Sequence, residues 1–303
     1  MTNCRIILAI SSVLVLSSSS YDVSASPAGA LAPVASEEAP KGHLFIIGGG
    51  SRPQEMMERF VDLAPGGRIV VFPMASAEPQ TVGPEQAEEL RKLGAKDVAV
   101  HNVTREQALA ADSGKILEGA GGVWFSGGVQ SRVTDILLDT PLHEKLLEIY
   151  EKGAVVGGTS AGAAIMSEIM ITGDEKREVK EGREFETIQA GNIVTTRGLG
   201  LWKAAIVDQH FATRKRHNRL ITLVLEHPEL PGIGIDESTA VIVSGGTRFE
   251  VIGRRNVIVF DARGAHIARR DPDAIGGTGL RMHVLLPGDA FDLAGSASSD
   301  KSR

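Results

Sequence analysis

Short apolar runs alternate with helix-compatible segments between His43 and the serine at position 160. The runs HLFII, RIVVF, DVAV, GVWF and AVV are apolar apart from the first residue of the first three, which predicts strands buried on both faces. The intervening segments PQEMMERFVDL, GPEQAEELRKLGA and TREQALAADSGKILEGA have helical periodicity, as has SRVTDILLDTPLHEKLLEIYEKG, in which Pro141 predicts a break. Alternating strands and helices predict a parallel sheet covered by helices on both faces.

The pattern changes after residue 160. Residues 172–189 form a charged run that is typical of a solvated loop. The later segments GIGIDESTAVIVSGG, TRFEVIGRRNVIVFDAR and LRMHVLLPGDAFDL alternate apolar and polar residues, which predicts strands. We therefore predict one domain over residues 43–293. Its fold class is α/β with a doubly wound, mostly parallel sheet, similar to flavodoxin or the class I glutamine amidotransferases, and its C-terminal portion is β-rich.

The N-terminal segment is typical of an export signal. Arg5 precedes an apolar run from Ile6 to Leu16, and a Val-Ser-Ala sequence at 23–25 provides a small-x-small cleavage pattern. The apolar run is shorter than the roughly 20 residues that span a bilayer, so a membrane anchor is disfavoured. We predict a signal peptide over 1–25, a flexible leader over 26–42, a disordered tail over 294–303, and a periplasmic or extracellular location.

Composition excludes several function classes. The 303 residues carry a formal charge of −6 and only 4 % aromatics, which argues against a nucleic-acid-binding surface. The single cysteine, Cys4, lies in the predicted signal, so the mature chain has no disulfide and no thiol nucleophile. Because no metal-binding motif is present either, we expect no metal and no cofactor.

The segment AVVGGTSAGAAIM contains Ser160 in a G-x-S-x-G pattern between a predicted strand and a predicted helix. In that context a serine sits on a tight turn with its hydroxyl exposed at the carboxyl end of the sheet, as a nucleophile. Small neighbours allow the strand and helix to approach closely. The alternative is a glycine-rich turn that serves packing or holds a phosphate.

The segment WFSGGVQ ends the preceding strand at the same edge of the sheet. Backbone N–H groups at Gly127 or Gly128, together with that of Ala161, are candidates to stabilise an oxyanion. A plain glycine turn is the alternative, whereas a nucleotide-phosphate loop would carry a lysine that this segment lacks.

The segment AAIVDQHFATRKRHNRL places His210 at the end of another predicted strand, where it is the best candidate for a general base. A structural histidine is the alternative. Arg214, Arg216 and Arg219 follow in the first turns of a helix that we predict to be capped by Thr213. Cations oppose the helix dipole there, so these arginines call for an anionic partner or ligand.

These motifs, with GIGIDESTA, VFPMASAEP and HVLLPGDAFDL, resemble those of the cyanophycinases, in the serine peptidase family that also contains the aspartyl dipeptidases. The resemblance extends from about His43 to Leu293. It implies a homodimer that hydrolyses cyanophycin, a poly-aspartate carrying arginine on each β-carboxyl, to β-Asp-Arg dipeptides through an acyl-enzyme. The implied catalytic residues are Ser160, His210 and an acid in the charged loop, Glu178 or, as second choice, Glu175.

By the same resemblance, the substrate pocket is lined by Gln130, Asp208, Gln209, Arg214, Arg216 and Arg219. Val129 departs from the acidic residue expected before Gln130. Two other functions stay open: an isoaspartyl or aspartyl dipeptidase with the same machinery, and a non-catalytic flavodoxin-like protein whose glycine loops bind an anion.

Overall fold

Five short apolar segments form the parallel centre of an eight-stranded sheet with the order β16-β11-β10-β1-β5-β4-β2-β3. The computed structural model describes residue 1 and residues 39–180 and 182–295. The parallel strands are β1 (His43–Ile47), β2 (Arg68–Phe72), β3 (Asp97–Val100), β4 (Gly122–Phe125) and β5 (Val155–Thr159). β1 continues the sheet in antiparallel pairing with β10 (Thr239–Ser244), and β11 (Arg248–Gly253) and β16 (Ala290–Asp292) follow.

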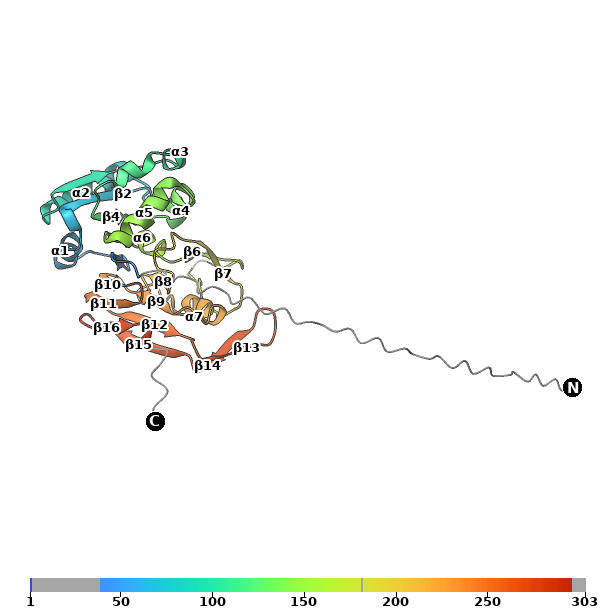
Figure 1. Cartoon of the computed structure of the whole chain (residues 1–303). Coiled ribbons are helices and arrows are strands. Elements are labelled where there is room, and N and C mark those ends of the chain that lie inside the picture. The colour runs from blue at the N-terminus through green and yellow to red at the C-terminus, as the bar shows by residue number, and fades with distance from the viewer. Residues whose placement is uncertain (2–38, 181, 296–303) are drawn as a thin grey trace, which may run out of the picture. The chain divides into compact units, whose positions relative to one another are not determined.

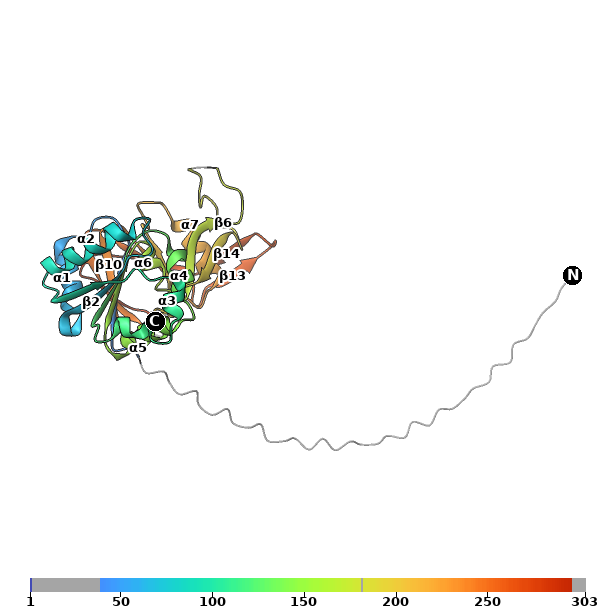
Figure 2. The ribbon, with the colours of Figure 1, turned by 90° about the horizontal axis from the view of Figure 1, so that it is seen from above.

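The side chains of each central strand alternate between two apolar layers. In β1, Phe45 and Ile47 face one layer while Leu44 and Ile46 face the other. The first layer packs against α1 (Gln54–Asp62) and α2 (Pro79–Lys92). The second packs against α3 (Arg105–Leu109), α4 (Gln130–Leu137), α5 (Pro141–Lys152) and α6 (Ala161–Ala164), and Figure 2 shows the two helix groups on opposite sides of the sheet. The predicted α/β class and largely parallel sheet are confirmed.

A second sheet of four strands has the order β15-β12-β9-β8. Its strands are β8 (Ile206–Gln209), β9 (Gly232–Ile235), β12 (Val257–Asp261) and β15 (Arg281–Leu285). Val207, Ile233 and Val259 join the second apolar layer of the main sheet, whereas Ile206 and Phe260 pack with Leu220 of α7 (His217–Glu226). Figure 1 shows these C-terminal strands with α7 beside β9 and β12, in agreement with the predicted β-rich C-terminal portion.

The remaining strands form two hairpins. β13 (His266–Arg269) pairs with β14 (Ile275–Thr278), and β6 (Ile169–Glu175) pairs with β7 (Ile193–Arg197). The charged run 172–189, predicted as loop throughout, therefore begins within β6. Two short 3-10 helices, Pro65–Gly67 and Ser113–Leu117, complete the secondary structure, and the second of them ends a segment predicted as one continuous helix.

The N-terminal predictions fall largely outside the described residues. The signal peptide over 1–25 and most of the leader lie there, as does the tail from residue 296. Lys41 and Gly42, at the end of the predicted leader, donate backbone hydrogen bonds to the carbonyls of Glu151 and Tyr150 in α5. Among the described residues, no helix has both the length and the apolar character needed to cross a bilayer.

Candidate active site

Ser160 occupies a sharp turn between β5 and α6. Its φ of 55° lies in the left-handed region, with ψ at −110°, and its N–H donates to the carbonyl of Ile47 at 3.1 Å. A Cβ at Gly158 would lie 2.4 Å from the carbonyl oxygen of Gly162, and one at Gly162 would lie 2.5 Å from that of Phe125. The small residues around the serine are thus required because strand, turn and helix are in backbone contact. α6 is a single short turn of four residues, so its dipole at the serine is small.

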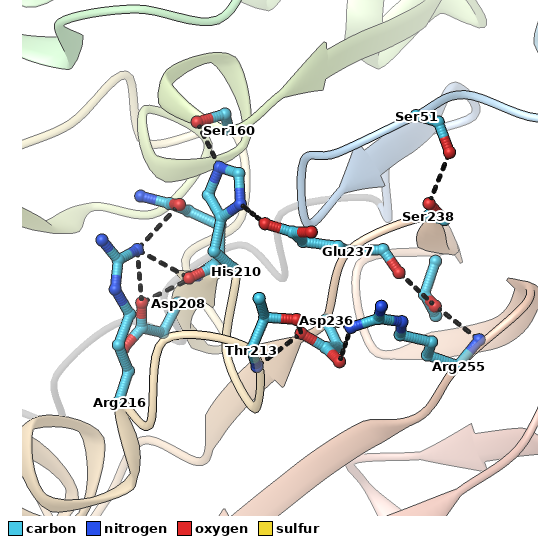
Figure 3. Close-up of polar contacts among 12 residues, drawn as sticks. Ser51, Ser160, Asp208, His210, Thr213, Arg216, Asp236, Glu237, Ser238 and Arg255 are labelled. Atoms are coloured by element: carbon cyan, nitrogen blue, oxygen red, sulfur yellow. Dashed lines mark hydrogen bonds and ion pairs between the residues drawn. The ribbon is translucent and has the colours of Figure 1, made fainter.

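His210 follows β8 directly and also has a left-handed backbone, with φ at 49°. Its N–H donates to the carbonyl of Gly48 at 2.6 Å, which ties the loop after β8 to the loop after β1. The imidazole Nε2 lies 2.9 Å from Ser160 Oγ, within hydrogen-bonding distance (Figure 3). The structure thus joins the predicted nucleophile and the predicted base.

The second imidazole nitrogen is bound by Glu237, which follows β9. His210 Nδ1 and Glu237 Oε1 are 2.6 Å apart, and Figure 3 shows the carboxylate and the serine on opposite nitrogens of one ring. A carboxylate on Nδ1 fixes the tautomer in which Nε2 is free to accept a proton from serine. Ser160, His210 and Glu237 therefore form a continuous hydrogen-bonded triad.

The predicted acids Glu178 and Glu175 do not occupy this position. Glu178 is exposed in the loop between β6 and β7. Glu175 accepts from the backbone N–H of Phe185 at 2.7 Å and from the side-chain amide of Asn192 at 2.6 Å, so its carboxylate closes that loop on itself. The prediction of Glu178 as the acid of the triad is therefore corrected to Glu237, because the acid has to bind the imidazole at Nδ1 and Glu237 is the carboxylate found there.

Burial lowers the pKa of His210 below its ordinary value, and the nearby charges of Arg214 and Arg216 lower it further. The hydrogen bond and charge of Glu237 oppose this and raise the pKa, but the net direction is down. The imidazole is therefore neutral at neutral pH, as a general base has to be.

The glycine loop after β4 lies against the serine. A Cβ at Gly127 would lie 3.5 Å from the Ser160 Cβ, and one at Gly128 would lie 2.0 Å from the carbonyl oxygen of Ala75. The Gly128 backbone, with φ at 139°, is thus pressed against the turn after β2. Ala161 is the first residue of α6, where an N–H has no acceptor within the helix. An oxyanion role for Gly128 and Ala161 stays a prediction.

Asp208 and Arg219 form a buried ion pair beneath this site. Arg219 Nε donates to Asp208 Oδ2 at 2.7 Å, its Nη2 donates to Oδ1, and both residues are 1 % exposed. The ring of Phe185 covers the guanidinium at 4.7 Å. Both residues were predicted to contact substrate, but such burial leaves neither of them accessible. The ion pair is instead placed to support the neighbouring residues of the site.

Arg216 is held next to this pair. Its Nη1 donates to the carbonyl of Gln209 at 2.7 Å and to Gln209 Oε1 at 2.8 Å, and it lies 3.9 Å from Asp208 Oδ1. Burial, and then the charge of Arg219, lowers the pKa of Arg216 to about 10, which leaves it protonated at neutral pH.

The other predicted pocket residues have different surroundings. Gln130 is 9 % exposed, and its Nε2 donates to the carbonyls of Ile171 at 2.9 Å and Thr172 at 2.6 Å, so it anchors β6. Arg214 is exposed in a turn that precedes α7. The predicted start of this helix is wrong: α7 begins at His217, and Thr213 binds Asp236 in place of capping a helix.

Sequence reasoning missed the loop 48–50 and the pair Asp236-Glu237. The loop 48–50 follows β1 of the main sheet and the pair follows β9 of the second sheet, and this position directly after a strand was the available signal. Within residues 39–180 and 182–295, no group of three or more His, Cys, Asp or Glu side chains is arranged to hold a metal ion.

Comparisons with known proteins agree with this site. Residues 44–251 match the profile of "Peptidase family S51". The chain is 34 % identical over 262 residues to a protein named cyanophycinase from Geminocystis herdmanii, an alignment that covers 82 % of this chain and 93 % of that protein. It is 33 % identical over 269 residues to a cyanophycinase from Trichormus variabilis, with coverages of 84 % and 87 %.

A solved structure supports the fold. The crystal structure of a peptidase from an acI-B1 Actinobacterium superposes with a TM-score of 0.61 at 21 % identity, and the match covers 84 % of this chain and 98 % of that one. The profile match and the two relatives confirm the expected membership of a serine-type peptidase family: this chain belongs to peptidase family S51.

Proposed function

We propose that this protein hydrolyses cyanophycin, using Ser160 as nucleophile, His210 as general base and Glu237 as the acid of the triad. The observation that carries the proposal is the hydrogen-bonded chain from Ser160 Oγ through both imidazole nitrogens to Glu237. The choice of cyanophycin as substrate follows the relatives named cyanophycinase, which are 33–34 % identical over most of the chain.

In the acylation step, Ser160 Oγ attacks the carbonyl carbon of a backbone amide while His210 Nε2 takes the hydroxyl proton. The Nδ1–H hydrogen bond to Glu237 stabilises the imidazolium that forms. N–H groups of Gly128 and Ala161 are proposed to receive the oxyanion. As the C–N bond breaks, His210 returns the proton to the leaving amine, and an ester to Ser160 remains.

Deacylation repeats these steps with water. His210 Nε2 takes a proton from water as its oxygen attacks the ester carbon. The C–O bond to Ser160 then breaks, and the proton passes from His210 to Oγ. The products are a carboxylic acid, which loses its proton to solvent, and the free hydroxyl of Ser160, so the triad returns to its starting state when the proposed β-Asp-Arg dipeptide leaves.

Substrate selection is proposed to rest on cations beside the triad. Arg214 is exposed near His210 and Arg216 is half-buried, whereas Arg219 is already paired. Arginine binds carboxylates with paired donors, so the aspartate carboxylates of the polymer suit Arg214 and Arg216. Export of the chain, suggested by its N-terminal sequence, would give it access to polymer outside the cell.

The proposal is tested with purified protein on cyanophycin and, separately, on Asp-X and β-Asp-X dipeptides. We expect release of β-Asp-Arg from the polymer, labelling of Ser160 by a fluorophosphonate, and loss of both in Ser160→Ala. Cleavage of the dipeptides alone would replace the polymer with short substrates. Absence of both turnover and labelling would favour the non-catalytic anion-binding alternative.

A further inference from the structure

Asp236 connects the loop of the base to the loop of the acid. It directly precedes Glu237 and is only 4 % exposed. Its Oδ1 accepts from the backbone N–H of Thr213 at 2.9 Å and from Thr213 Oγ1 at 2.8 Å. Since Thr213 lies in the turn after His210, one carboxylate spans both catalytic loops, as Figure 3 shows.

Arg255 completes this connection. Its Nη1 donates to Asp236 Oδ2 at 3.2 Å and to Thr213 Oγ1 at 2.5 Å. The N–H of Asp236 donates to the carbonyl of Asn256 at 3.3 Å, so the segment before β12 is attached to the loop after β9 by side chain and backbone. The Thr213 hydroxyl is therefore fixed in direction: it accepts from Arg255 and donates to Asp236.

We propose that Asp236 is a positioning residue for the peptidase reaction, which holds the turn 211–216 in register with Glu237 through Thr213 and Arg255. The inference rests on the proposed function but concerns a residue that touches neither Ser160 nor the imidazole. The turn it holds carries Arg214 and Arg216, whose charges act on His210. Release of the turn therefore changes both the geometry and the electrostatics of the base.

The chemistry of Asp236 suits this role. Burial alone raises the pKa of a carboxyl, but the hydrogen bonds from Thr213, Glu237 N–H and Arg255 outweigh burial and lower the pKa of Asp236. The carboxylate therefore stays charged, and charge-assisted hydrogen bonds are shorter and stronger than neutral ones. A buried charge with this many donors holds its neighbours in one arrangement.

The test compares Asp236→Ala with wild type by the rate of fluorophosphonate labelling at Ser160 and by kcat on cyanophycin, each against pH. We expect both rates to fall on the order of 100-fold, the cost of a small misplacement of catalytic groups. The acid limb of labelling should move to higher pH, because Arg214 moves away with the turn, whereas Arg216 stays bound to Gln209 and Glu237 stays bound to His210.

Two variants at Thr213 and a control at Asp261 separate positioning from folding. Thr213→Val removes the hydroxyl link and should repeat the effect in part, whereas Thr213→Ser keeps both contacts and should behave as wild type. Asp261→Asn is the matched control, because Asp261, the last residue of β12, is 0 % exposed and is likewise bound by arginines, by Arg263 and by Arg281 of β15. It should lower the melting temperature without moving the pH profile.

Unchanged labelling and pH profile in folded Asp236→Ala and Thr213→Val would overturn the inference, as would an equal effect of Asp261→Asn. Labelling does not depend on the natural substrate. Normal labelling of wild type without cyanophycin turnover would therefore refute the proposed substrate. The role of Asp236 would then be decided by the labelling rates of the variants alone.

Discussion

Gly49 lies directly against the imidazole of His210. A Cβ at Gly49 would come within 2.3 Å of Cε1 and 2.4 Å of Nε2, and the φ of Gly49 is 106°. The loop after β1 thus packs against the His210 ring close to the two nitrogens that bind Ser160 and Glu237. A residue with no side chain is required there on both steric and backbone grounds.

Gly49→Ala is expected to reduce kcat severely, because the imidazole has to leave the line between Ser160 and Glu237. The measurement is kcat on cyanophycin together with the melting temperature. Gly94→Ala is a matched control: its φ is 100°, but a Cβ there has nothing within 4 Å. Both variants carry backbone strain, so loss of activity only in Gly49→Ala identifies the contact with His210 as the cause.

Glu237→Gln should lower kcat on the order of 10,000-fold, as loss of the acid does in other serine triads, because the favoured tautomer of His210 is no longer fixed. Glu178→Gln is expected to leave kcat unchanged, since Glu178 is exposed and away from the ring. A result with the two effects exchanged would restore the assignment made from sequence. Circular dichroism of both variants checks that the fold is intact.

The fold was predictable where the chain obeys simple periodicity. Apolar runs such as RIVVF and GVWF became buried parallel strands, and Pro141 marked the break between α4 and α5. The hairpin β6–β7 was not predicted, because the end of β6 carries the charged residues Asp174 and Glu175, has a register shift after Ile171, and pairs only with a strand beyond the loop. The start of α7 was placed too early because Thr213 resembles a helix cap but binds Asp236.

The site was predictable only in part, for a related reason. Ser160 and His210 follow strands, so a local rule located both of them. Glu237 follows β9 in the same way, but β8 and β9 are adjacent in a separate sheet, and such pairing is not visible in the sequence. We predicted Glu178 in the charged loop as the acid of the triad, although a high density of charge on a loop is more often a sign of solvent exposure.

The acid limb of activity should lie below pH 6.5, the ordinary pKa of histidine. Burial, Arg214 and Arg216 lower the pKa of His210, so the neutral base persists as pH falls. Arg214→Ala removes one positive charge and should move the acid limb of fluorophosphonate labelling toward higher pH. Arg214→Lys keeps the charge and should leave the limb in place. A downward shift in Arg214→Ala would contradict this electrostatic account.

Asp208→Asn should destabilise the protein by about 3–5 kcal/mol, because it leaves the charge of Arg219 without its partner in a buried site. Arg219→Met should cost less, because Arg216 stays 3.9 Å from Asp208. Arg219 donates two hydrogen bonds to Asp208, and both residues are 1 % exposed, so water does not replace a lost partner. Urea unfolding measures the effect, and the double variant should cost less than the sum of the single ones. Arg59→Ala breaks a pair whose side chains are 51 % and 45 % exposed, and it should cost at most about 1 kcal/mol. If Asp208→Asn instead kept full stability and lost only substrate affinity, Asp208 would be a substrate ligand, as the sequence predicted.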